Sequence, residues 1–136
     1  VKLANEASIS NNLGAASFRE AIDGDGFPKV PLDEVRLESR PDFVKIDVEG
    51  AELQVLKGAL NLLGSQKPVV LLEHGIGSSD FYGTLPEHIF DLFAGCGLRM
   101  FLVRKWLKSG GRDSLSRQAF FDQYWDQTNY FFLAGP

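Results

Sequence analysis

The spacing of apolar residues changes near the middle of the chain. Residues 43–48 are β-branched and apolar and lie between Pro41 and Gly50, which predicts an interior strand. Beyond Gly50 the apolar residues recur every three or four positions with polar residues between them, which predicts an amphipathic helix that ends at Gly64. The leucines that form its apolar side are Leu53, Leu56, Leu60 and Leu63. The chain therefore passes directly from a strand into a helix.

The remaining segments extend this alternation of strands and helices. Residues 68–73 form a near-continuous apolar run, as in a strand covered on both faces, and complete a right-handed parallel βαβ unit. On the C-terminal side we predict helices over 85–94 and 114–124, and strands over 97–103 and 129–134. On the N-terminal side we predict short strands over 1–7 and 15–18 and a helical turn over 31–35. The order of these elements indicates a single α/β layered domain.

Composition limits the class of protein further. The chain has 136 residues, of which 44% are hydrophobic, enough for the core of one domain. Its 14 Lys and Arg residues and 18 Asp and Glu residues give a net charge of −4 without a basic block, which argues against nucleic-acid binding by charge alone. The sequence has neither the run of about 18 apolar residues that a membrane span needs nor a secretory signal, so we expect a cytoplasmic protein. Cys96, the single cysteine, is expected to be a small buried hydrophobe.

Acidic side chains follow the first of these strands. In an open parallel sheet, ligands bind beyond the carboxyl ends of the strands, where Asp47 and Glu49 lie. Alternation along the strand puts Lys45 on the same side as these two carboxylates. Either the acidic groups take part in chemistry at the rim of the sheet, or they are structural. In the structural alternative Lys45 pairs with Asp47. Glu49 and Glu52 then only supply negative charge at the start of the helix.

One long run of charged and apolar residues resembles the signature of the FkbM family of methyltransferases. The run is Lys45-Ile46-Asp47-Val48-Glu49-Gly50-Ala51-Glu52, followed by Val55-Leu56-Lys57-Gly58-Ala59. The segments around it follow the order of that family: 1–7, 14–18, 30–34 and 68–73. The resemblance covers about the first three-quarters of the chain, whereas the region after Arg104 agrees only as a pattern of strands.

The resemblance implies a partial Rossmann-like class I methyltransferase fold, an α/β fold with a mostly parallel sheet and an antiparallel C-terminal strand. A complete domain of that kind would have seven strands, and a Gly-rich loop after the first would hold S-adenosylmethionine. No G-x-G-x-G motif follows a strand here, because Gly24 and Gly26 belong to an Asp-Gly-Asp-Gly loop. We therefore expect residues 1–136 to be the C-terminal part of the domain, strands three to seven, with the N-terminal cofactor-binding part absent. The sheet edge exposed in this way would favour self-association.

The function that the resemblance implies is S-adenosylmethionine-dependent O-methylation of a small-molecule hydroxyl, on a sugar, a lipid or a secondary metabolite. Asp47 and Glu49 would lie near the cofactor. The acceptor hydroxyl must lose a proton, and Asp47 or His74 could accept it. His74 follows the strand predicted at 68–73, which should lie beside the first strand. A lone histidine at a strand end is also commonly a partner for loop hydrogen bonds, and this alternative stays open.

The substrate side of the site is predicted from residues at the end of the second strand and beyond it. Glu73, Phe81 and Tyr82 are candidate substrate contacts, the last two as an exposed aromatic pair in the loop 75–83. A plain connecting loop is the alternative. The acidic residues and the histidine at these strand ends do not follow a recognised metal-binding spacing, so no metal site is predicted. His88, inside the next predicted helix, is expected to be a surface or packing residue.

A second function stays open beside the methyltransferase. The missing Gly-rich loop favours a non-catalytic remnant of the fold that binds a partner or a ligand. An α/β-hydrolase is disfavoured because the sequence has no G-x-S-x-G motif. The aromatic residues Trp106, Tyr124 and Trp125 are expected to pack around the last strand.

Overall fold

The structure is a computed structural model of the chain, and it describes residues 30–136. The short strands predicted over 1–7 and 15–18 lie outside the described residues. Within residues 30–136, four strands form one mixed sheet with the spatial order β1-β2-β4-β3. These strands are β1 (Phe43–Ile46), β2 (Val69–Glu73), β3 (Arg99–Leu102) and β4 (Phe131–Gly135).

The strand directions match the predicted parallel unit and the predicted antiparallel last strand. β1 pairs with β2 in parallel, with Phe43 opposite Val69 and Ile46 opposite Leu72. β4 lies between β2 and β3 and is antiparallel to both, so β1, β2 and β3 point the same way. The ends of β1 and β2 therefore meet at one edge of the sheet, the carboxyl edge, formed by residues 47–49 and Glu73. β1 and β3 are the outer strands in the described part, and self-association through an outer strand stays a prediction.

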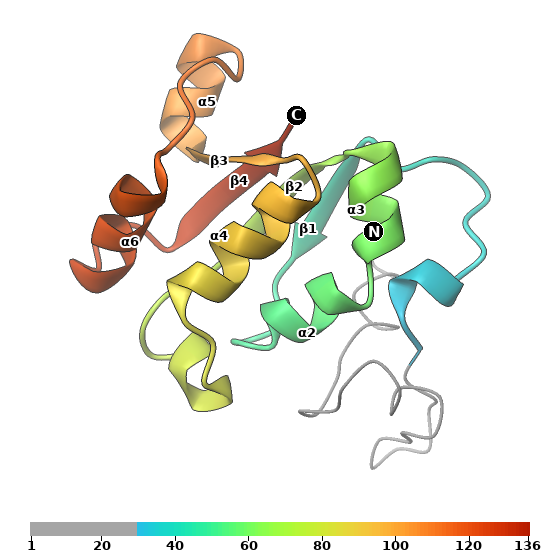
Figure 1. The fold of residues 1–136 in the computed structure, drawn as a ribbon, viewed down its shortest axis with the longest axis horizontal. Coiled ribbons are helices and arrows are strands. Elements are labelled where there is room, and N and C mark those ends of the chain that lie inside the picture. Colours follow the sequence, from blue (N-terminus) through green and yellow to red (C-terminus); the bar gives the residue numbers. More distant parts are fainter. Residues whose placement is uncertain (1–29) are drawn as a thin grey trace.

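Five α-helices and two short 3₁₀ helices connect the strands of the described part (Figure 1). The α-helices are α2 (Glu52–Lys57), α3 (Leu60–Gln66), α4 (Pro86–Gly95), α5 (Val103–Ser109) and α6 (Arg117–Trp125), and the 3₁₀ helices are η2 (Leu32–Glu34) and η3 (Ser79–Tyr82). In Figure 1, α4 lies in front of the sheet and α2 lies at the end of β1, and both helices contribute residues to the same core cluster. α5 follows β3 without a loop, and the sequence prediction missed this helix because it extended the strand to residue 103.

The core lies between the helical layer and one face of the sheet. Alternate residues of β1 and β2 are buried on that face and pack in one cluster with apolar residues of the helices. The cluster includes Val44, Ile46, Leu56, Val70, Leu72, Phe93 and Phe120. Full burial of side chains of this kind stabilises a fold by roughly 1.5–3 kcal/mol each. The opposite face of the sheet is less covered, and Phe43 of β1 is 45% exposed there.

Two packing predictions need correction. Tyr124 is buried as expected, but Trp125 is 55% exposed and meets the Tyr124 ring only edge-on. Cys96 is a free thiol that is half-buried, not enclosed, and this partial burial raises its pKa. Trp125 is the last residue of α6, and Cys96 follows the last residue of α4. Both residues therefore lie at the C-terminal end of a helix, where fewer neighbours cover them.

The single helix predicted after Gly50 is two helices, and the prediction that it ends at Gly64 is wrong. α3 runs through Gly64 to Gln66. Lys67 ends α3 in the left-handed conformation, with a φ of 51°. Leu60, predicted to lie on the apolar side, is 46% exposed. The break before α3 therefore turns its first residue outward.

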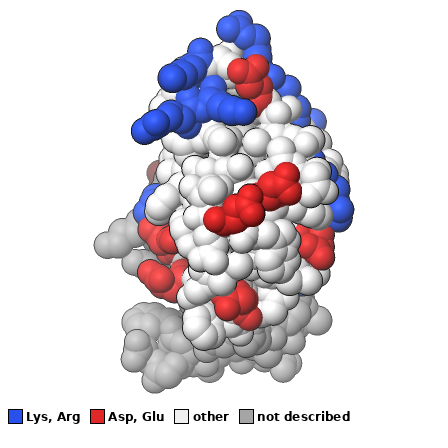
Figure 2. All heavy atoms as spheres, turned by 90° about the vertical axis from the view of Figure 1, so that its left-hand side faces the viewer, with Lys and Arg blue, Asp and Glu red and all other residues white. Residues whose placement is uncertain are grey.

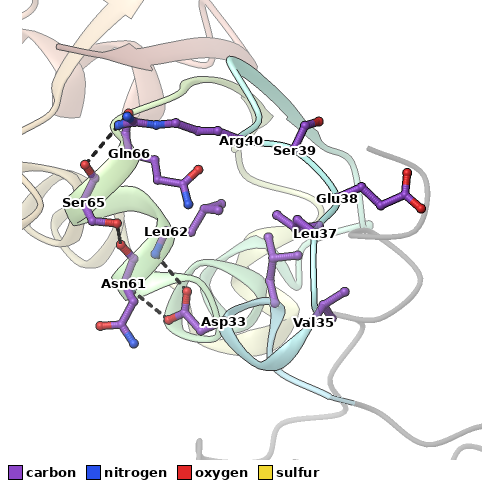
Figure 3. Close-up of a pocket in the computed structure, with 11 residues that line it drawn as sticks. Asp33, Val35, Leu37, Glu38, Ser39, Arg40, Asn61, Leu62, Ser65 and Gln66 are labelled. Carbon is purple, nitrogen blue, oxygen red and sulfur yellow. Dashed lines mark hydrogen bonds between the residues drawn. The ribbon is translucent and has the colours of Figure 1, made fainter.

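Asp33 of η2 accounts for the break because it bonds to both the donor and the acceptor of one helical hydrogen bond. In a continuous helix Leu62 N would donate to Gly58 O. Here Asp33 N donates to Gly58 O at 2.8 Å, and Asp33 Oδ1 accepts from Leu62 N at 2.9 Å. Asp33 Oδ2 also accepts from Asn61 N at 2.8 Å, so the carboxylate caps the start of α3 (Figure 3). Arg40 donates to the last carbonyl groups of α3, so the segment 33–40 holds this helix at both ends.

Charged side chains are unevenly distributed over the surface. Arg104, Lys105 and Lys108 are exposed on α5. In the side view of Figure 2, Lys and Arg side chains gather at the top, and Asp and Glu side chains lie mostly lower on the same face. Although the net charge of the chain is −4, its surface therefore carries a small basic cluster on α5.

We predict that Asp33→Ala lowers the free energy of unfolding by about 1–2 kcal/mol, because it leaves the first N–H groups of α3 without their acceptor. Glu38→Ala is the matched control, since Glu38 is exposed on the same segment and points away from α3 in Figure 3. Urea unfolding at neutral pH measures both variants. The control should stay within about 0.5 kcal/mol of the wild type. Equal losses in the two variants would contradict the role of Asp33.

Candidate functional site

The turn between β1 and α2 has an unusual backbone conformation. Glu49 and Gly50 are both left-handed, with φ of 52° and 97°. Gly50 also presses against the loop that follows β2, because a Cβ atom at Gly50 would lie 2.3 Å from Ser78 O. Only glycine fits this contact. The turn after β1 and the loop after β2 are therefore fixed against each other.

Glu52 holds this turn from inside the protein. The residue is 1% exposed, and its Oε1 accepts hydrogen bonds from Gly50 N at 3.1 Å and from Val48 N at 3.3 Å. Its Oε2 is buried without a hydrogen-bond partner in the described part of the chain. Burial raises the pKa of Glu52, although the backbone hydrogen bonds oppose this shift. Glu52 is thus more than a charge at the helix start, because its carboxyl group closes the turn that precedes the helix.

Three of the predicted site residues meet at the carboxyl edge. Asp47 and Glu49 are exposed there, and Glu73 is half-buried. The β1–β2 register, continued by one residue, places Asp47 beside Glu73. Burial raises the pKa of Glu73, and the charges of Asp47 and Glu49 raise it further. Lys45 opposes this shift. The edge therefore carries a negative potential that would attract a cation.

Lys45 pairs with Asp47, as the structural alternative predicted. Lys45 Nζ lies 2.5 Å from Asp47 Oδ2, and the two side chains are 47% and 36% exposed. Solvent weakens an ion pair of this kind to roughly 0–1 kcal/mol. Asp47 Oδ1 makes no hydrogen bond within residues 30–136. The pair therefore orients the carboxylate and leaves one of its oxygens available.

His74 lies on the other side of β2 from Glu73 and is 0% exposed. Its ring stacks on Tyr124 and Phe120 of α6, with 4.8 and 6.0 Å between ring centroids. His74 Nδ1 lies 2.8 Å from Ser79 Oγ, and Nε2 is buried without a partner in the described part. Burial lowers the pKa of His74 to about 4. The structure thus places His74 in the core under α6, where it bonds to a loop residue, and its role as a proton acceptor stays a prediction.

The loop after β2 separates the two aromatic residues that were predicted as a pair. Phe81 is 79% exposed, whereas Tyr82 is half-buried and lines a hollow of about 410 Å³ beside α2 and α4. Ser79 anchors the loop, because it is buried against His74 and its hydroxyl also accepts from Gly75 N at 3.4 Å. Sequence reasoning missed Ser79, since a lone serine in a loop forms no pattern that would reveal this contact.

One further hollow offers less chemistry. A hollow of about 370 Å³ lies between the segment 33–40 and α3 (Figure 3). Asp33 and Arg40, which line it, are already bonded to α3. Because this segment precedes β1 and α3 precedes β2, the hollow belongs to the sheet edge opposite the carboxyl edge. Within residues 30–136, no group of three or more His, Cys, Asp or Glu side chains is arranged to hold a metal ion.

The mixed sheet, its parallel βαβ unit and its acidic edge define an α/β protein that is compatible with part of a methyltransferase-like fold. The chain belongs to the FkbM methyltransferase family, because the family model described as the methyltransferase FkbM domain matches residues 2–100. The match confirms the resemblance found in the sequence and includes the carboxyl edge, whereas the residues after 100 lie beyond it. Comparison with curated proteins and with solved structures gave no match. None of the helices in the described part is both long and apolar enough to cross a membrane.

We predict that His74 makes the protein sensitive to mild acid. Its pKa of about 4 in the folded protein lies below the ordinary value of 6.5, so the unfolded chain binds the proton more tightly. The corresponding stability is fully present above pH 6.5 and is lost as the pH falls from 6.5 toward 4. Between about pH 7 and pH 4.5 the loss is about 2 kcal/mol.

Two variants isolate this contribution. His74→Phe keeps a ring against Tyr124 but cannot be protonated, so it should lack the loss. His88→Gln removes an exposed histidine whose charge is the smaller cause of the lowered His74 pKa, so it should keep most of the loss. Chemical unfolding at the two pH values measures the free energy of unfolding of each variant relative to the wild type. Contributions from the carboxylates that all the proteins share cancel in this difference. A difference between His74→Phe and wild type that does not change with pH would contradict the role of His74.

Proposed function

We propose that the chain is the part of an S-adenosylmethionine-dependent O-methyltransferase that positions the acceptor hydroxyl of a sugar, a lipid or a secondary metabolite. The observation that supports this most is the acidic edge formed by Asp47, Glu49 and Glu73 in a chain of the FkbM family. The parallel β1–β2 pair and the reversed β4 support the assignment to a Rossmann-like class I fold. In sheets of that kind, ligands bind beyond the carboxyl ends of the strands.

The acidic edge suits a cofactor that carries a positively charged sulfur. S-adenosylmethionine supplies, when bound, an electrophilic methyl group on that sulfur. Asp47 and Glu49 are the residues that we assign to the cofactor, because both carboxylates are exposed at the edge. The raised pKa of Glu73 supports the fit, since it reflects in part a repulsion among carboxylates that a cation would relieve.

Asp47 is also the residue that we assign to the acceptor hydroxyl. Lys45 holds its Oδ2, which fixes the direction of the carboxylate and leaves Oδ1 to accept the proton that the hydroxyl loses. Glu73, Phe81 and Tyr82 are assigned to the rest of the acceptor. Phe81, at 79% exposure, can cover an apolar part of it.

His74 is the second candidate for the proton acceptor. At 0% exposure its ring could reach an acceptor only after the loop anchored by Ser79 moves. Its pKa of about 4 keeps the imidazole neutral near pH 7, the form that accepts a proton, but also makes it a weak base. Asp47 needs no such movement, so it is the first choice.

A ligand-binding module without catalysis is the second candidate function. The observation in its favour is that Lys45 already pairs with Asp47, as it would if this carboxylate had a structural role. Both functions would use the carboxyl edge, and only the methyltransferase requires a proton acceptor. Methyl transfer therefore separates the two.

Asp47→Asn tests the assignment, because it keeps the shape of the side chain and removes its charge and basicity. In the full-length protein we predict a loss of roughly 10²–10⁴-fold in single-turnover methyl transfer, with little change in melting temperature. Glu49→Gln removes a neighbouring charge, and Lys45→Met breaks the ion pair but keeps the base, so both should cost less. Labelled S-adenosylmethionine and a panel of sugar, lipid and metabolite acceptors provide the assay. If Asp47→Asn transfers methyl groups within a few-fold of the parent rate, the proton acceptor must be sought at His74.

A further inference from the structure

The hollow beside Tyr82 differs from the carboxyl edge in its charge. Its volume of about 410 Å³ lies within the usual range for small-molecule sites. Its walls are Leu53, Gln54 and Lys57 of α2, Tyr82 and Gly83 of the loop after β2, and His88 and Leu92 of α4. None of these residues is acidic, whereas the carboxyl edge gathers three carboxylates. We call this cavity the α2–α4 hollow.

The α2–α4 hollow lies close to the proposed reaction site along the chain. α2 begins directly after the turn that Glu52 closes, and Tyr82 ends the loop whose Ser78 presses on Gly50. α2 and the loop after β2 thus connect the hollow with the carboxyl edge. The hollow lies in the helical layer and not on the open face of the sheet.

Gln54 brings an unsatisfied acceptor to the hollow. Gln54 Oε1 is buried and has no hydrogen-bond partner in the described part of the chain. A buried acceptor without a donor costs roughly 1–3 kcal/mol. Because this oxygen has almost no accessible surface, a ligand hydroxyl can supply the missing donor only after the half-buried Gln54 side chain rotates toward the hollow.

His88 and Lys57 bring donors to the same cavity. His88 Nδ1 accepts a hydrogen bond from Leu85 N at 3.1 Å, so the proton of the neutral ring is on Nε2, which is then a donor. Lys57 is exposed and forms no ion pair within residues 30–136. Asp91 of α4 does not line the hollow, and Arg117 neutralises it at 2.8 Å.

We propose that the α2–α4 hollow binds the anionic end of a hydroxylated acceptor, namely a sugar ring that carries a carboxylate or a phosphate. Lys57 would pair with the anion, and Gln54 Oε1, once its side chain has rotated toward the hollow, would accept from a ring hydroxyl. The Tyr82 ring offers a flat apolar surface for the C–H face of the sugar. The carboxylates of the edge repel the anion, so they orient the ligand with its anionic end in the hollow and a neutral hydroxyl toward Asp47.

This inference names the substrate class of the proposed methyltransferase and in that sense rests on it, but binding can be measured without catalysis. Glucuronic acid, glucose 6-phosphate and glucose are titrated into the ¹⁵N-labelled full-length protein without S-adenosylmethionine. We expect shifts in the side-chain amide of Gln54 and in the backbone of residues 82–88. At least one of the two acids should bind about 5-fold or more tightly than glucose, and the arm that does so identifies the anion.

Three variants test the assigned contacts. Lys57→Met should remove the preference for the acid and leave glucose binding unchanged, whereas Gln54→Leu should weaken all three sugars. Lys105→Met removes an exposed lysine of α5, outside the hollow, and should change nothing. Equal binding of acidic and neutral sugars, shifts confined to other residues, or no shift up to about 50 mM would overturn the site. Binding at the hollow without methyl transfer would sink the proposed function and leave the site standing, and methyl transfer without such binding would do the reverse.

Discussion

The carboxyl group of Glu52, buried under the turn between β1 and α2, is the interaction on which the arrangement of the site depends. It accepts two backbone hydrogen bonds from inside the protein, where little water competes for them. With the turn closed in this way, Glu49 and Gly50 keep their left-handed conformations, and the chain leaves β1 with Asp47 facing solvent. The contact of Gly50 with Ser78 then fixes the loop after β2 to the same edge. The cost is one carboxyl oxygen buried without a partner.

Elements with strong local signals could be predicted from the sequence, and those set by distant contacts could not. Two apolar runs of strand length became β1 and β2, in the predicted parallel pairing. The leucine spacing predicted one continuous helix. Hydrophobic periodicity carries no information about Asp33, a residue far upstream that bonds to both partners of one helical hydrogen bond. α5 was missed for a different reason, since Leu102 and Val103 continue an apolar run and the helix begins without a side-chain cap. Breaks and starts of this kind depend on tertiary contacts.

The same distinction applies to the site. Strand alternation and the parallel pairing were enough to gather Asp47 and Glu73 at one edge. Alternation also requires that the next residue, His74, points to the other side of the sheet, into the helical layer. Its full burial comes from Phe120 and Tyr124 of α6, which lie far along the chain and outside any local pattern. The sequence thus predicts which residues reach the edge better than it predicts what covers them.

Carboxyl-detected NMR titration of Glu52 tests the central role of this residue most directly. We expect a Glu52 pKa above the ordinary value of 4.5, because burial outweighs the backbone hydrogen bonds that the carboxylate accepts. The backbone amide signals of Val48 and Gly50 should move in the same titration, since their N–H groups donate to this carboxyl group. A Glu52 pKa at or below 4.5, with those two signals unchanged, would mean that the carboxyl group is solvated and that other contacts hold the turn.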